Sequence, residues 1–218
     1  MPVSSPAKPE PRVAKGARTR ESILRAAVDL ASVEGLEGLT IGRLAQELKM
    51  SKSGLFAHFG SKEDLQLATV DTARQIFVDY VMRPALAQPA GMPRLLALCD
   101  NWLGHVENRV FKGGCFFTAA SFEMDSRPGP VRDRIVQAMR AWLDQLSRAA
   151  DEARKAGHID AGIDPRQFAF EIYSLAIGGH WGAQLFNDKH AMRKLRANIR
   201  ARLRALATPK CPPLRKSG

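Results

Sequence analysis

The chain has 218 residues, of which 45% are hydrophobic and 25% are charged, a composition that is ordinary for a soluble globular protein. No apolar run reaches the roughly 20 residues that a transmembrane helix needs, so the sequence predicts a protein that does not span a membrane. The net charge of +11 favours polyanionic partners such as nucleic acid, although a merely solvated basic surface would have the same charge.

The first 18 residues combine four prolines with basic side chains and have almost no apolar ones. Such a segment cannot offset its ordering entropy by burial, so we predict a disordered basic arm over residues 1–18. This arm is either a passive tail or a segment that follows the DNA backbone or enters the minor groove.

A first helix is predicted to begin near Thr19 and to end at Gly35. Its apolar residues recur at helical spacing and form one stripe that should be buried: Ile23, Leu24, Ala27, Leu30 and Ala31. This helix should complete a three-helix domain over residues 19–65.

Two short helices follow with only a brief turn between them. Thr40 is a good N-cap for a helix from Ile41 to Leu48, and Ser51 caps a second helix only three residues later. Two helices joined by a three- or four-residue turn form the helix-turn-helix, whose second helix lies in the major groove of DNA.

The second of these helices would have one buried face and one face for DNA. Leu55 and Phe59 lie close together at 100° per residue and should pack inward. The opposite face has little side-chain bulk and can approach base edges closely; with its border it comprises Lys52, Ser53, Gly54, Phe56, Ala57 and His58. A helical hairpin with a purely structural role would show a similar pattern.

The expected contacts divide into bases and phosphates. Lys52, aided by His58, should make the main polar base contact, and Ala57 should contact an apolar group such as a thymine methyl. Three residues at helix starts or on the flank should bind phosphates: Thr40, Arg43 and Lys62.

The stretch from Thr19 to Leu65 resembles the tetracycline-repressor (TetR) family of transcriptional regulators. The resemblance rests on Gly35-Leu36, on Thr40, and on the run Ser51-Lys-Ser-Gly-Leu-Phe-Ala-His-Phe-Gly-Ser-Lys-Glu-Asp-Leu65. Two positions differ from the usual family pattern. Lys49 lies where the family usually has a turn glycine, and Phe56 lies where the family commonly has a tyrosine whose hydroxyl often binds a phosphate. The resemblance implies a homodimeric repressor that a small, largely apolar ligand releases from a palindromic double-stranded DNA operator.

The rest of the chain is predicted to be an all-helical second domain over residues 66–206, followed by a disordered tail over residues 207–218. Ser61 should start a helix that runs toward Tyr80 and links the two domains. Breakers then separate further helices near 93–107, 131–156 and 165–176, and a last helix with an apolar stripe ends at Leu206. The expected fold class is therefore all-α.

The resemblance implies an effector cavity and a dimer interface in this second domain. The candidate cavity residues, which plain core packing would also explain, are Trp102, His105, Phe116, Phe117, Phe122, Trp142, Tyr173, His180 and Trp181. The last two helices would supply the dimer interface through six apolar residues: Phe168, Ile172, Leu175, Leu195, Ile199 and Leu203. The alternative is that the same residues form a seam within one subunit.

The sequence gives no sign of catalysis. Cys115 follows a Gly-Gly pair and could be a nucleophile, but no residue is identifiable as its general base. The histidines are too dispersed in the sequence for a metal-binding motif. We therefore expect that the protein is not an enzyme and binds no metal or cofactor. The three cysteines, without disulfide spacing, favour the cytoplasm. A competing hypothesis is a helical interaction protein, because Lys189 to Gly218 holds ten basic residues and no acidic ones for an acidic partner or RNA.

Overall fold

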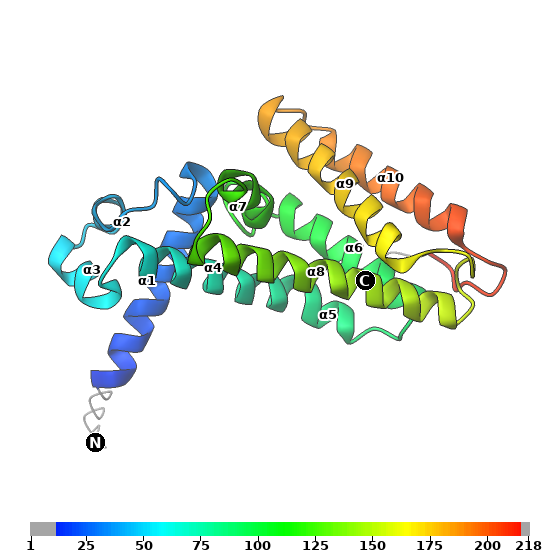
Figure 1. Cartoon of the computed structure of the whole chain (residues 1–218), viewed down its shortest axis with the longest axis horizontal. Helices are drawn as coiled ribbons and strands as arrows, with labels where there is room; N and C mark the ends of the chain where they lie inside the picture. Colours follow the sequence, from blue (N-terminus) through cyan, green and yellow to red (C-terminus); the bar gives the residue numbers. More distant parts are fainter. Residues whose placement is uncertain (1–11, 215–218) are drawn as a thin grey trace, which may run out of the picture.

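The computed structural model describes residues 12–214, which form helices and no β-sheet, so the predicted all-α class is confirmed. The head, residues 12–61, contains α1 (Arg12–Glu34), α2 (Ile41–Leu48) and α3 (Lys52–Phe59). The body, residues 62–214, contains α4 (Lys62–Phe77), a π-helical segment η1 (Val78–Met82), α5 (Arg83–Leu86), α6 (Met92–Glu107), α7 (Phe116–Met124), α8 (Pro130–Lys155), α9 (Pro165–Leu185) and α10 (Ala191–Leu206). Figure 1 shows the head at one end and the α9–α10 pair along one side of the body.

The helices of the head begin where their capping side chains predict. Thr40 Oγ1 accepts a hydrogen bond from the Arg43 backbone N–H at 3.0 Å, and Ser51 Oγ accepts one from Gly54 at 3.1 Å. Each satisfies an N–H that has no partner within the helix, which contributes roughly 1 kcal/mol. Between the two helices Lys49 adopts a left-handed conformation with φ of 53°, at a cost of roughly 1 kcal/mol for a residue with a Cβ.

One contiguous core joins the head to the body. Leu55 and Phe59 are buried as predicted and join the stripe of α1 in that core. α4 packs against α1 in the head and against α8 in the body, so it is shared by both parts.

The helical run that begins at α4 does not stop at Pro84. It changes to π-helical geometry over Val78–Met82, where the Arg83 N–H bonds to the Val78 carbonyl, and then continues through Pro84 as α5. Proline lacks the N–H that the Tyr80 carbonyl would receive in an α-helix, and the π turn accommodates this loss. The helix that was predicted to run toward Tyr80 therefore continues to Leu86.

Both predicted tails are shorter than expected. α1 begins at Arg12, so residues 12–18 continue a helix instead of belonging to a disordered arm; residues 1–11 lie outside the described part of the chain. Residues 207–214 are also ordered, because the Thr208 N–H bonds to the His158 carbonyl and Leu214 packs against the core. Residues 215–218 lie outside the description.

Head and body meet at a close backbone contact, which we call the head–body seam: the loop 110–114 and α7 against the end of α1. The Gly113 N–H bonds to Ser32 Oγ at 3.0 Å, and a Cβ on Gly113 would lie 1.7 Å from the Ser32 carbonyl oxygen. Arg25 also donates to the Val110 carbonyl at 2.6 Å. Only glycine fits at position 113 in this arrangement.

Candidate DNA-binding surface and ligand cavity

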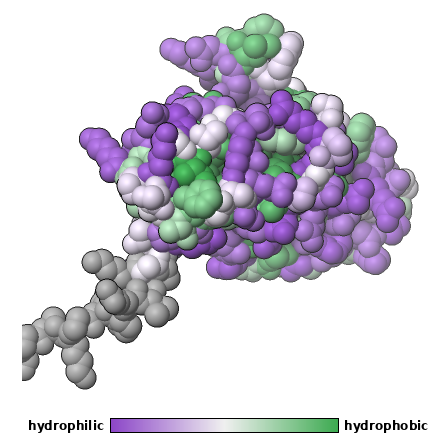
Figure 2. Space-filling view, turned by 60° about the vertical axis from the view of Figure 1, so that its left-hand side comes forward, coloured by the Kyte–Doolittle hydropathy of each residue, from purple (hydrophilic) through white to green (hydrophobic). Residues whose placement is uncertain are grey.

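The outer face of α3 carries the side chains that the sequence predicts for DNA. Lys52, Ser53, Phe56 and Ala57 are exposed, and Gly54 and His58 are half-buried. With Ile41 and Gly42 of α2, the exposed four line an open hollow on the surface of the head. Figure 2, in which this end of the molecule comes forward, shows small hydrophobic patches among hydrophilic side chains.

Lys52 supplies a positive charge to this face of α3, and Phe56 supplies an exposed aromatic ring. A Cβ on Gly42 would lie 3.4 Å from Lys52 Cε, so the lysine stem lies across α2 at its glycine. Lys52 forms no ion pair within the described part of the chain, which leaves its ammonium group available to an acceptor. Phe56 is 56% exposed, unusual for a large apolar ring, and it suits contact with a sugar or a thymine methyl.

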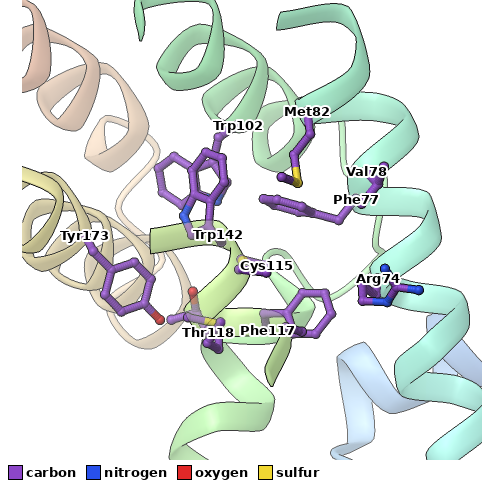
Figure 3. A pocket seen from close by; sticks show the side chains of 13 residues that line it. Arg74, Phe77, Val78, Met82, Trp102, Cys115, Phe117, Thr118, Trp142 and Tyr173 are labelled. Carbon is purple, nitrogen blue, oxygen red and sulfur yellow. The ribbon is translucent and has the colours of Figure 1, made fainter. Parts of the chain in front are cut away.

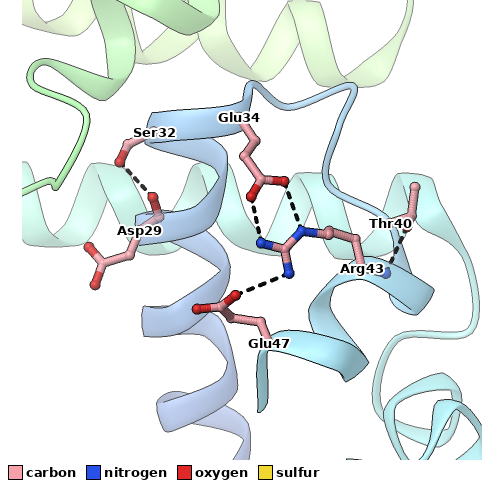
Figure 4. A network of polar contacts seen from close by, with 6 residues as sticks. All are labelled: Asp29, Ser32, Glu34, Thr40, Arg43 and Glu47. Atoms are coloured by element: carbon pink, nitrogen blue, oxygen red, sulfur yellow. Dashed lines mark hydrogen bonds and ion pairs between the residues drawn. The ribbon is translucent and has the colours of Figure 1, made fainter. Parts of the chain in front are cut away.

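The two cations expected on phosphates are already paired inside the protein. Arg43 donates two hydrogen bonds to Glu34, at 2.9 and 2.5 Å, and one to Glu47 at 3.0 Å, as Figure 4 shows. The Lys62 ammonium lies 2.6 Å from Glu37, and this hydrogen bond lowers the pKa of the Glu37 carboxyl. Arg43 therefore joins α1 to α2, and each of these two cations would have to exchange a carboxylate for a phosphate to make the predicted contact with DNA. Thr40 remains exposed at the start of α2.

A largely apolar cavity of about 130 Å³ lies in the body between α4, η1, α6, α7, α8 and α9. Four of the predicted residues line it: Trp102, Phe117, Trp142 and Tyr173. The lining residues that the sequence analysis missed are Arg74, Phe77, Val78, Met82, Cys115, Thr118, Ala138, Met139 and Ala141. Figure 3 shows that α4 and the π segment supply one wall. Phe77, Val78 and Met82 are apolar residues at ordinary helical spacing, a pattern that plain core packing also gives, so it did not point to a cavity.

The other five predicted cavity residues do not line this space. His105 and Phe116 are buried beside it, in an aromatic cluster with Phe111 and Phe77. Phe122 and Trp181 are each 56% exposed, because they lie on the outer faces of α7 and α9, so their prediction is wrong. His180 is half-buried near Gly114, away from the cavity.

Few polar groups reach the cavity. Thr118 Oγ1 is buried without a hydrogen-bond partner of normal geometry, and the Tyr173 hydroxyl points toward it (Figure 3). Burial raises the pKa of the Tyr173 phenol, so this group stays protonated and can donate a hydrogen bond at neutral pH. Arg74 lies exposed at the opposite side of the cavity.

His105 is the most unusual buried polar side chain. It is 0% exposed, neither ring nitrogen has a hydrogen-bond partner, and its ring packs against Phe77, Tyr80 and Phe111. Burial, assisted by the positive charge of Arg25, lowers the pKa of His105 to about 4. The imidazole is therefore neutral at physiological pH.

The predicted dimer seam lies inside the subunit. Five of its six residues are at most 3% exposed: Phe168, Ile172, Leu195, Ile199 and Leu203. Leu175 is half-buried. These side chains are buried because the apolar stripes of α9 and α10 face each other and the rest of the core. Within one subunit these five side chains are already buried, which favours the intramolecular alternative for them. The large apolar side chains that α9 and its end expose are Phe170, Trp181, Leu185 and Phe186.

The basic surplus of α10 is largely paired within the fold. Arg196 and Arg200 both bond to Asp100 of α6, at 2.8 and 2.7 Å, and Arg202 bonds to Glu171 of α9 at 2.7 Å. These contacts weigh against a free basic helix that binds an acidic partner or RNA.

One helix connects the cavity to the head. Near its start α7 places Phe117 and Thr118 at the cavity. Near its end, Glu123 accepts hydrogen bonds at 2.7 Å from the backbone N–H groups of Leu36 and Glu37, in the turn between α1 and α2. A change in the position of α7 would therefore act directly on the head.

Residues 12–214 contain neither a metal-binding cluster nor a helix that could span a membrane. No group of three or more His, Cys, Asp or Glu side chains lies close enough to hold a metal ion. None of the helices found there combines the length and the apolar character needed to cross a bilayer.

Comparison with known proteins gives one consistent result. The model of bacterial regulatory proteins of the tetR family matches residues 23–69, and the tetracyclin repressor-like C-terminal domain matches residues 91–199. The HTH-type transcriptional regulator TcmR of Streptomyces glaucescens is 31% identical over 198 residues, covering 87% of this chain and 84% of TcmR.

Solved structures share the fold at lower identity. A TetR transcriptional regulator from Chloroflexus aurantiacus superposes with a TM-score of 0.81 at 21% identity, covering 89% of this chain and 98% of that one. AibR, solved in complex with isovaleryl coenzyme A and operator DNA, superposes with a TM-score of 0.68 at 22% identity, covering 86% and 98%.

Proposed function

Because the chain belongs to the TetR family of DNA-binding transcriptional regulators, we propose that it is a homodimeric repressor that a small molecule releases from its operator. The observation that carries the proposal is the outer face of α3. Lys52, Ser53 and Ala57 are exposed there, while Leu55 and Phe59 fix the helix from behind. A helix held in this way can enter a major groove with its small side chains against the base edges.

Specificity would come from a few contacts. Lys52 supplies the main polar donor, aided by His58, and Phe56 with Ala57 supplies apolar surface for thymine methyls. Ser53 and Gly54 let the backbone approach closely. Backbone N–H groups at the start of α2, with the Thr40 hydroxyl, would bind phosphate, because a helix N-terminus attracts anions. Discrimination would also depend on DNA shape, since this face offers few bidentate donors.

The proposed dimer surface is the outer face of α9. Phe170, Trp181 and Leu185 follow one another at near-helical spacing with Ser174 and Gly178 between them, and all five are exposed. Figure 2 shows hydrophobic side chains on the projecting tip where α9 turns into α10. Such an apolar stripe is self-complementary about a two-fold axis, which a palindromic site requires.

Release would follow from differential binding to two states of the body. The cavity is bounded by α4, which is shared with the head, and by α7, whose Glu123 holds the α1–α2 turn. A ligand that favours one arrangement of these two helices would change the spacing of the two heads and lower operator affinity. AibR, crystallised with both an acyl-coenzyme A and operator DNA, supports a ligand-responsive function by analogy.

The test is selection of DNA from a random duplex pool by the full-length chain, followed by gel shifts. We expect enrichment of an inverted repeat, bound by two chains, with binding reduced at least tenfold for Lys52→Ala. The exposed Lys189→Ala, far from α3, serves as the matched control. If no inverted repeat is enriched, or if Lys52→Ala binds every enriched site like the parent chain, the proposal is wrong.

A further inference from the structure

The polar groups of the cavity lie on its two sides, with apolar side chains between them. Figure 3 shows Arg74 on one side and Tyr173 with Thr118 on the other. The space between them is bounded by rings, including Phe77, Phe117 and Trp142. A ligand that fills this space meets apolar surface along its length and polar groups at its ends.

The charge of the lining residues is one-sided. Arg74 is the charged residue among those that line the cavity, and no carboxylate lies among them. The acidic side chains about one turn away, Asp71 and Asp79, are already paired with Arg134 and Arg83. Arg74 forms no ion pair within the described residues, so its guanidinium is available to an anion. A cationic ligand inside the cavity would meet repulsion from Arg74 and no carboxylate among the residues that line the cavity.

Arg74 also lines an open polar groove between α1, α4 and α8. An anionic group beside it would keep part of its hydration and avoid the desolvation cost of a buried ion pair. At the other side Thr118 is 1% exposed, and its Oγ1 has no partner of normal geometry. A ligand hydroxyl or carbonyl would supply the missing hydrogen bond.

The size of the cavity limits the ligand. Its volume of about 130 Å³ is close to that of an engineered cavity of about 150 Å³ that binds benzene. One ring therefore fits without rearrangement of the walls.

We propose that the cavity binds a one-ring aromatic carboxylate, with the carboxylate at Arg74, the ring between Phe77, Phe117 and Trp142, and a polar group at Thr118 and Tyr173. This rests on the proposed function in taking the cavity as the effector site, and it adds the chemical class of the effector.

Isothermal titration of the full-length chain with four matched probes tests this class. We expect 4-hydroxyphenylacetate to bind more tightly than phenylacetate, and phenylacetate about three- to tenfold more tightly than phenylacetamide, since a charge-assisted hydrogen bond is stronger than a neutral one. The cation 2-phenylethylammonium should bind most weakly. The class is wrong if the amide or the ammonium binds as tightly as the acid, or if no probe binds at millimolar concentration.

Variants of Arg74 and Thr118 test which residue binds each end of the ligand. Arg74→Gln should abolish the preference for acid over amide, and Arg74→Lys should retain it. Thr118→Val should abolish the advantage of the para-hydroxyl group, and Thr118→Ser should retain it, with circular dichroism to establish that each variant is folded. If Arg74→Gln still prefers the acid, the assignment of the guanidinium as the anion partner is overturned.

These titrations contain no DNA, so they are independent of the proposed repressor activity. A probe that binds with the expected selectivity yet leaves operator binding unchanged would contradict ligand-induced release and leave the ligand class standing. Operator binding without binding of any probe would overturn the ligand class alone.

Discussion

The rings of Trp181 and Phe186 pack edge to face, with 4.6 Å between centroids and 79° between planes, although both side chains are more than half exposed. This pair therefore holds a large apolar surface in a fixed orientation at the tip of α9. Fixed aromatic surface loses little side-chain entropy on association, a property shared by residues that dominate interfaces.

Trp181→Glu should dissociate the proposed dimer and leave the subunit folded, because the carboxylate is hydrated in the monomer and would be desolvated only in the proposed interface. Ile199→Glu should instead unfold the body, since Ile199 is 1% exposed inside one subunit. Light scattering and circular dichroism separate these results. A Trp181→Glu chain that remains a dimer would show that the two-fold axis lies elsewhere.

Glu123→Gln should weaken the head–body seam. The carboxylate accepts two charge-assisted hydrogen bonds from the α1–α2 turn, and a neutral amide can accept at only one of its two ends. We expect a loss of about 1–3 kcal/mol in the free energy of unfolding of the head, measured by hydrogen exchange at Leu36 and Glu37. Glu63→Gln, an exposed change on α4, is the control, and equal exchange rates in both variants would contradict this function for Glu123.

Lys52→Ala and Lys62→Ala should differ in the salt dependence of DNA binding. Lys52 is unpaired in the described structure, so its removal should reduce the slope of log affinity against log salt by about one unit. Lys62 is held by Glu37 at 2.6 Å and displaces fewer counterions, so its slope should change by less. Equal changes would mean that DNA draws Lys62 away from Glu37.

His105 should make the fold sensitive to acid. Its pKa is about 4 in the folded chain and near 6.5 when unfolded, so the unfolded chain binds more protons between these values. The free energy of unfolding should fall by up to roughly 3 kcal/mol as pH drops from 7 to 4, and this contribution is fully present above pH 6.5. His105→Leu should lose less stability over that range, whereas the exposed His190→Ala should behave like the parent. Parallel curves for parent and His105→Leu, from urea unfolding at each pH, would contradict this.

Local signals predicted much of the fold. Thr40, Ser51 and Ser61 each accept a hydrogen bond from the first turn of their helix, so these helix starts were correctly predicted from the sequence. Capping depends on neighbours two or three residues away, which a sequence displays directly. The buried side of α3 was also predicted correctly, because Leu55 and Phe59 lie on one helical face.

Contacts between residues that lie far apart in the sequence could not be predicted from local patterns. An apolar stripe shows that a helix packs against another helix, but it does not say whether that helix belongs to the same subunit. The sequence therefore left both a dimer interface, which the family resemblance implies, and an intramolecular seam open for α9 and α10. Nor does a run of cations reveal the carboxylates that will neutralise it: Arg200 meets Asp100 a hundred residues away. Nine of the thirteen residues that line the cavity were missed, because they come from elements far apart in the sequence that only the fold brings together.

The contact at Gly113 determines which relative motions of the head and body are possible. Because any Cβ at position 113 would collide with the Ser32 carbonyl oxygen, the two backbones already lie as close as they can, and we expect relative motion of head and body to pivot about this contact. Rotation about a fulcrum near the end of α1 would carry α3, at the far side of the head, through a larger arc than the body helices that drive it. In such a rotation a small displacement beside the cavity would become a larger one at the outer face of α3.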